Sequence, residues 1–486
     1  MSPADPPSTR REPSPASPPE PVSGPLTPAA RGRRLVVLAA LVACLLVAIA
    51  AAAVSVAPVD DPSSPGGAPA NATTGLERLH VRGVTGEGVS VGVVGVTGFD
   101  TDLPALAGRT VEARSFAAGE TVRNGGRTDH GTAAASLVAR AAPGADLYLA
   151  SFDTQDGFRR AVAWLLRAEV DVVVAPVEFY GVPGDGTSAA AGVARLAATH
   201  DTTLVVPAGT LGRGHWRGRF APDAAGRHEF PDGPRNYLLD GDGRRATLWL
   251  SWSGSESGAG TSTSTDFTLE LHRVEGTTTR LVAESRPYTG DAVPNERIVA
   301  EIDPDGTYYV VLRGPPNATG TRVEVSSPTH AFQFRERAGS IVAPATAEAA
   351  VSVGAYDPRD GRVEPFSSAG PTTDGRPGVD VVAPDRLRAA GEPTGRVGSS
   401  AAAPYTAGLV ALLLDAGGDR PADEVERLLE RTARDVGPDG VDPVAGHGLV
   451  APERAVAASR NASRDSRSKP GFSHGQDLAA GDPTDA

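Results

Sequence analysis

The chain has 486 residues, with 46 basic and 59 acidic side chains and a formal net charge of −13 at pH 7, and it is long enough for two or three domains. The acidic balance disfavours nucleic acid as a partner, and because Lys469 is the only lysine, the charge pattern indicates a salt-adapted, arginine-based surface. Cys44 is the only cysteine, so no disulfide can form within the chain.

A long apolar segment follows a proline-rich N-terminus. Residues 1–34 contain ten prolines and are expected to be disordered and cytoplasmic. Residues 35–57 carry no charge and are long enough to span a bilayer, and the arginines before them favour a cytoplasmic N-terminus. The alternative is a cleaved secretory signal, but the length of the run and Pro58 after the best small-residue site favour a retained anchor. Either way we expect the main domains outside the cytoplasm, after a disordered linker over residues 58–75.

Short apolar strands then alternate with alanine-rich helices. The expected strands are 89–94, 145–150, 170–175 and 203–206, and the expected helices are 130–141, 156–169 and 187–199. Continuous apolar strands joined by helical crossovers predict an α/β fold, a parallel sheet with helices on both faces.

Residues 215–337 interrupt this alternation. Strand-like runs separated by loops rich in glycine, serine and threonine predict an inserted antiparallel β-sandwich with no recognisable metal site. The α/β domain is therefore expected in two parts, 76–214 and 338–458. A polar, disordered tail is expected over 459–486.

Two segments carry residues suited to nucleophilic catalysis. Residues 398–404 read GSSAAAP and precede the apolar run 405–414, which places Ser400 at the start of a buried helix. The N–H groups at a helix start point outward and favour developing negative charge. Residues 129–136 read DHGTAAAS, and His130 in this segment is a candidate general base.

These segments resemble motifs of the subtilase family, the subtilisin-like serine peptidases, in the family's order. GSSAAAP resembles the family's Gly-Thr-Ser-x-Ala-x-Pro, and DHGT resembles its His-Gly-Thr motif. Further similar segments are 142–148, 342–348, 351–355, 366–372, 374–384 and 446–456. The resemblance implies a subtilisin-like fold over 76–214 and 338–458, peptide-bond hydrolysis, Ser400 as nucleophile and His130 as base.

The position of the family's catalytic aspartate carries no carboxylate. Counting along the first strand places Gly95 there, whereas counting back from the Thr97-Gly98 pair places Val96 there. In the family this aspartate holds the histidine in the right tautomer and stabilises the imidazolium.

Three nearby acids are candidates to replace the aspartate. Asp100 and Asp102 lie beyond the turn, where acids usually cap or solvate loops, and Asp100 is the best candidate. Asp129 adjoins His130 in sequence, so its side chain rarely reaches the far ring nitrogen.

Two further positions depart from the family. Thr210 stands where an asparagine amide donates to the oxyanion, and its hydroxyl is a shorter, rotatable donor. Pro176, Val177, Glu178 and Phe179 match the edge strand that pairs with bound peptide. Pro176 lacks an N–H, and Phe179 stands about where a small residue lets substrate approach, so we expect altered peptide binding.

The resemblance predicts an extracytoplasmic, membrane-anchored serine endopeptidase homologue that acts on peptides or proteins and is impaired by the missing acid. The alternative is an inactive pseudopeptidase that binds or scaffolds a peptide or protein ligand. The missing acid, the missing amide and the altered peptide-binding strand favour this alternative, as does the short stretch between the apolar segment and the first core strand, where no pro-domain fits. No cofactor is identified; family members often bind structural calcium, but nothing in the sequence places its ligands.

Overall fold

The computed structural model describes residues 74–118, 121–122, 130–182, 184–241, 243–252, 266–288, 295–387 and 398–468. The predictions for segments 1–34 and 35–57, for nearly all of the linker 58–75 and for Asp129 concern residues outside this set. By length and apolar composition, no single helix of the described residues could span a membrane. Helices 399–417 and 422–432 meet the test only as a pair that is bent by 105°.

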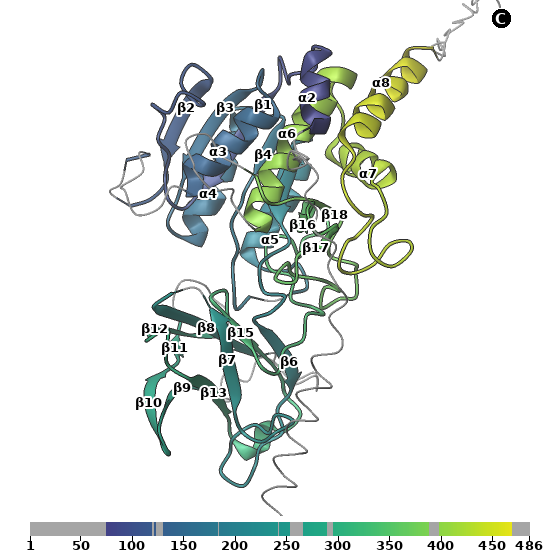
Figure 1. The fold of residues 1–486 in the computed structure, drawn as a ribbon. Helices are drawn as coiled ribbons and strands as arrows, with labels where there is room; N and C mark the ends of the chain where they lie inside the picture. The colour runs from purple at the N-terminus through teal and green to yellow at the C-terminus, as the bar shows by residue number, and fades with distance from the viewer. Residues whose placement is uncertain are drawn as a thin grey trace, which may run out of the picture. The chain divides into compact units, whose positions relative to one another are not determined.

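An eight-stranded sheet forms the centre of the α/β domain, in the order β17-β16-β5-β4-β1-β3-β2 with β18 beside β16 (Figure 1). Its strands are β1 (Ser90–Gly95), β2 (Thr110–Ser115), β3 (Asp146–Ser151), β4 (Val172–Val174), β5 (Thr203–Pro207), β16 (Val351–Asp357), β17 (Arg362–Val363) and β18 (Val381–Pro384). All pairs are parallel except β16 with β17. The predicted parallel sheet is therefore confirmed.

Helices cover both faces of this sheet. They are α2 (Thr74–Val81), α3 (His130–Ala141), α4 (Gln155–Arg167), α5 (Ala189–Ala198), α6 (Ser399–Gly417), α7 (Ala422–Thr432) and α8 (Pro452–Ser468). The side chains of strand β1 alternate between the two faces of the sheet. Val91 and Val93 belong to the buried cluster with α3 and α6. Val94 belongs to the opposite cluster with α4 and α5, and Gly92 lies against Leu165 of α4. This alternation is the period of two that a strand imposes on its side chains.

Helix α6 is the most deeply buried helix of the domain, with an unbroken run of buried residues from Ala401 to Leu414. It packs closely on α3, because a Cβ added at Gly408 would lie 2.3 Å from the Cβ of Ala141. Glycine at position 408 thus allows the two backbones to approach. The contact fixes α6 beside α3, the two helices that carry Ser400 and His130.

Residues 215–337 form two five-stranded antiparallel sheets, in the orders β10-β9-β13-β7-β15 and β11-β12-β8-β14-β6. The strands are β6 (His215–Arg219), β7 (Asn236–Gly241), β8 (Arg245–Trp252), β9 (Thr268–Glu275), β10 (Thr278–Glu284), β11 (Arg286–Pro287), β12 (Asn295–Glu301), β13 (Tyr308–Arg313), β14 (Arg322–Ser326) and β15 (His330–Phe332). Both sheets contribute to one buried cluster, with Leu248 and Ile298 from one and Leu271 and Val310 from the other. The first strand of this segment, β6, pairs with β14, so that His215 lies opposite Ser326.

The C-terminal helix corrects the predicted start of the tail. A disordered tail was expected from residue 459, but α8 continues to Ser468. The helix continues because polar side chains near its C-terminal end are hydrogen-bonded to other parts of the domain, which the sequence alone does not show. Ser459 is buried and donates to the carbonyl of Leu413 at 2.9 Å, while Nη2 of Arg420 donates to the Ser459 carbonyl at 2.8 Å and to the Ser463 hydroxyl at 2.6 Å.

The packing of α6 on α3 gives a stability prediction. Gly408→Ala should lower the free energy of unfolding by about 1–3 kcal/mol, because the added methyl group overlaps Ala141. Gly192→Ala in α5 is the matched control, since its Cβ would meet only the end of the Arg195 side chain at 3.5 Å. The control should be neutral or stabilising by roughly 0.5–1 kcal/mol. Urea unfolding measures both, and equal effects would contradict the proposed packing.

Candidate active site

The two candidate catalytic side chains lie at the starts of two packed helices. His130 is the first residue of α3, and Ser400 is the second residue of α6. Both are partly buried. Gly398 precedes α6 with φ 130°, a conformation that side chains rarely adopt, and so lets the chain turn sharply into the helix. The start of a long helix carries partial positive charge, which suits a serine whose reaction develops an anion.

The end of β1 lies beside the start of α3. The Thr97 hydroxyl accepts the backbone N–H of Gly131 at 2.8 Å. A Cβ added at Gly95 would lie 3.3 Å from Cα of Gly131 and 3.4 Å from the ring of Phe99, so a carboxylate has little room there. Val96 is 53% exposed and leaves room for a substitution. Neither candidate position supplies an acid.

Asp100, the preferred replacement acid, is exposed and engaged locally. Its Oδ1 accepts the N–H of Asp102 at 3.2 Å, and its own N–H donates to the Thr132 hydroxyl of α3 at 2.9 Å. Its carboxylate thus caps a turn, which is the ordinary use of an acid in such a loop.

The segment after β4 carries an acid that the sequence analysis assigned only to peptide binding. Glu178 Oε2 accepts the Thr210 hydroxyl at 2.9 Å, the Thr210 N–H at 3.3 Å and the Tyr180 hydroxyl at 2.6 Å. The Thr210 hydroxyl, expected at the oxyanion, thus donates to Glu178. Burial raises the pKa of Glu178, while hydrogen bonds from Tyr180, Thr210 and Ser399 act in the opposite direction. The Ser399 hydroxyl also donates to the carbonyl of Gly209 at 3.1 Å, which joins α6 to the Thr210 segment.

The expected peptide-pairing segment is partly used by the chain itself. Regular pairing of β4 ends at Val174, and the Phe179 N–H donates to the carbonyl of Ala343 at 2.9 Å. The Phe179 ring, which we expected where substrate approaches, packs on Phe152 and Phe158, with ring centroids 6.3 Å and 5.2 Å away. The aromatic side chain therefore belongs to the hydrophobic packing on the α4 and α5 face.

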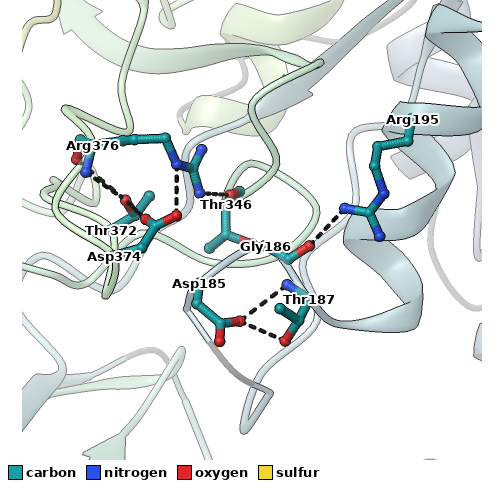
Figure 2. A network of polar contacts seen from close by, with 8 residues as sticks. All are labelled: Asp185, Gly186, Thr187, Arg195, Thr346, Thr372, Asp374 and Arg376. Atoms are coloured by element: carbon teal, nitrogen blue, oxygen red, sulfur yellow. Dashed lines mark hydrogen bonds and ion pairs between the residues drawn. The ribbon is translucent and has the colours of Figure 1, made fainter.

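Arg195 holds the chain that leads into α5, and Arg376 holds Thr346 and Asp374 in other loops of the domain (Figure 2). Arg195 of α5 donates to the carbonyl of Gly186 at 3.1 Å. Arg376 donates to the carbonyl of Thr346 at 2.7 Å and pairs with Asp374 at 2.9 Å. Figure 2 shows these contacts together with Asp185, Thr187 and Thr372. The Arg195 contact fixes the chain just before α5, while Arg376 links the Asp374 turn to Thr346.

Asp385 is a buried acid that the sequence analysis missed. It directly follows β18, and its Oδ2 accepts the N–H of Gly398 at 3.1 Å, two residues before Ser400. The residue is 0% exposed, and Oδ1 has no hydrogen-bond partner among the described residues. Burial raises the pKa of Asp385 to about 7, with the Gly398 N–H acting in the opposite direction. The sequence signal that could have identified Asp385 is its position directly after Val382-Ala383-Pro384, a segment that resembles the family.

Three acids meet elsewhere in the domain. Oxygen atoms of Asp380, Glu426 and Glu430 lie within 4.8 Å of one another. Burial raises the pKa of Asp380 well above its ordinary value and that of Glu426 to about 7. Carboxylates are the ligand type of calcium, although the ion takes six to eight oxygens. The sequence shows the i, i+4 spacing on α7 but does not show that Asp380 lies opposite it.

Comparisons with known proteins agree with this architecture. Residues 320–448 match the model described as the subtilase family, a span that includes Ser400 but not His130. The CspB protease of Clostridium perfringens is 18% identical, with a TM-score of 0.54, and the match covers 78% of this chain and 94% of that one. Fervidolysin from Fervidobacterium pennivorans, a keratinolytic enzyme related to subtilisin, is 18% identical with a TM-score of 0.42, over 79% and 45% of the two chains. A lanthipeptide protease is 14% identical with a TM-score of 0.46, over 80% and 93%.

The buried Asp385 predicts a pH dependence of stability. Its folded-state pKa of about 7 exceeds the ordinary 3.8, so its burial favours folding in acid and opposes it increasingly as pH rises from about 4 to about 7. Asp385→Asn keeps an acceptor for Gly398 and removes the charge. It should raise the free energy of unfolding at pH 8 by up to about 4 kcal/mol and change it little at pH 4.

Urea unfolding of both proteins across this range provides the measurement. Asp360→Asn serves as the control, because this exposed carboxylate pairs with Arg362 at the surface and its loss should change stability little at any pH. Parallel pH profiles for the native chain and Asp385→Asn would contradict the prediction.

Proposed function

The chain belongs to the subtilase family, and on that premise we propose that it is a serine endopeptidase in which Ser400 attacks peptide carbonyls with His130 as general base. The observation that carries the proposal is the placement of Ser400 as the second residue of α6. This helix packs on α3, the helix that begins at His130. The matched family segment includes Ser400. Peptides or proteins are the substrates on this proposal.

The chemistry requires only groups that the chain supplies. His130 takes the proton of the Ser400 hydroxyl as the oxygen bonds to the carbonyl carbon, and the carbonyl oxygen becomes negative. When this intermediate collapses, the protonated imidazole gives its proton to the leaving amine, and water releases the acyl group by the same steps. Without a triad acid, turnover falls by about 10⁴, because the imidazolium loses its stabilising partner.

A second candidate function is a pseudopeptidase that binds or scaffolds a peptide. The observation that favours it is the hydrogen bonding of Thr210, because both its N–H and its hydroxyl donate to Glu178. A site whose donors are already used within the chain stabilises an oxyanion poorly.

The apolar segment 35–57 supports a location outside the cytoplasm. We propose that it anchors the protein as a single membrane-spanning helix with the α/β domain and the 215–337 insert on the far side. Structural calcium is compatible with this location, and Asp380, Glu426 and Glu430 are the described residues closest to a ligand set.

The reactivity of Ser400 separates the two candidate functions. The native chain in high salt should react covalently with a fluorophosphonate probe, and Ser400→Ala should abolish the reaction. Ser399→Ala is the matched control, since this hydroxyl is buried and donates to Gly209, and its loss should leave labelling in place. A native chain that is folded and stays unlabelled would establish the pseudopeptidase.

Restoring an acid at the end of β1 should raise activity. Val96→Asp should increase the labelling rate at least about tenfold, because an acid there can orient His130 and stabilise its charge. Gly95→Asp is the comparison, and it should instead destabilise the fold, because its Cβ would lie 3.3 Å from the Gly131 backbone. Peptide hydrolysis and urea unfolding measure the two effects. A gain only in Gly95→Asp would assign the acid position to residue 95.

A further inference from the structure

Glu178 is held between the two elements that supply oxyanion donors in this family. Thr210 follows β5 and occupies the amide position, and Ser399 begins α6 immediately before the nucleophile. Three hydrogen bonds converge on one oxygen of Glu178: the hydroxyl and N–H of Thr210 and the hydroxyl of Tyr180 all donate to Oε2. The Ser399 hydroxyl is a further hydrogen-bonding neighbour of the same carboxyl group.

Two opposing effects act on this carboxyl group: the three donors favour its charged form, whereas burial favours its neutral form and raises its pKa. In a protonated carboxyl, Oε2 is the carbonyl oxygen that accepts hydrogen bonds, and Oε1 carries a proton that can be donated. The groups that face the carboxyl are Tyr180 from its own segment, Thr210 from the chain after β5, and Ser399 from α6. Of these only Tyr180 is titratable, and burial together with the adjacent Glu178 raises the pKa of Tyr180 well above its ordinary value. No cation is among these neighbours, and burial raises the pKa of Glu178.

We propose that Glu178 is a catalytic residue whose protonated carboxyl donates the oxyanion hydrogen bond that the missing asparagine amide supplies in other family members. The proposal rests on the proposed peptidase function and names the group that completes its site. Thr210 is then a positioning residue, because its N–H and hydroxyl hold Oε2 and leave Oε1 to face the reacting carbonyl. On this proposal, an acid from the segment after β4 takes the role of the asparagine amide found in other family members.

The reaction balances with the proton kept on Glu178. Ser400 Oγ bonds to the carbonyl carbon, its proton goes to His130, and the π electrons move to the carbonyl oxygen. That oxygen accepts a hydrogen bond from the Oε1–H group and returns the electrons when the amine leaves with the proton from His130. An ionised Glu178 has no proton to donate and repels the developing oxyanion. A carboxyl kept neutral by an apolar site is a known way to supply such a donor.

The test follows the rate of Ser400 phosphonylation by a fluorophosphonate probe as a function of pH in three full-length proteins. In the native chain the rate should rise as His130 loses its proton and fall again as Glu178 ionises. Glu178→Gln carries a permanent N–H donor of the same shape, so its rate should remain high at alkaline pH. Glu178→Ala should be slower by about 10²–10³ at every pH, since it lacks one oxyanion donor.

The outcomes distinguish the two proposals. An alkaline fall that persists in Glu178→Gln, or native rates in Glu178→Ala, would overturn the role of Glu178 while leaving the peptidase intact. A faster Glu178→Ala would show that the carboxyl obstructs the site instead of serving it. No phosphonylation of Ser400 in any variant at any pH, in proteins shown by circular dichroism to be folded, would overturn both the peptidase and the donor role.

Discussion

The parallel register of the central strands is the constraint on which the site depends. Because β1, β4, β5 and β18 run in one direction, the residues that follow their carboxyl ends emerge at one edge of the sheet. Position 95, Glu178, Thr210 and Asp385 all lie at or just beyond such strand ends. The close packing of α6 on α3 then fixes the two helices whose first turns hold Ser400 and His130. No single segment carries the site.

The electrostatics of this edge differ from those expected of a complete triad. Neither expected position carries an acid, yet two other carboxyl groups, the partly buried Glu178 and the fully buried Asp385, have pKa values raised by removal from water. Each accepts hydrogen bonds from neutral donors, and removal from water outweighs these bonds and, at Asp385, the nearby charge of Arg386.

The sequence predicted what depends on local pattern and missed what depends on side-chain direction between distant segments. The helix that begins at His130 ends at Ala141 as expected, and the strands near 146–151 and 203–207 follow from continuous apolar runs. Glu178 and Thr210 lie 32 residues apart, and only the fold shows that their side chains meet. Asp385 and Gly398 meet across the end of β18, and Arg420 holds the polar end of α8, contacts that no periodicity reveals. The Ser400 and His130 assignments came from family motifs and remain predictions.

The pairing of β6 with β14 has a consequence for how the chain folds. Strands β5 and β16 are neighbours in the central sheet, but residues 208–350 separate them along the chain. Bringing such distant segments together carries a large loop-closure entropy and slows folding. If the two-sheet insert forms first, its ends meet where His215 lies opposite Ser326. The loop that must then be closed between β5 and β16 consists only of the short segments on either side of the insert. By holding the two segments close together, the insert would then speed the formation of the central sheet that it interrupts in sequence.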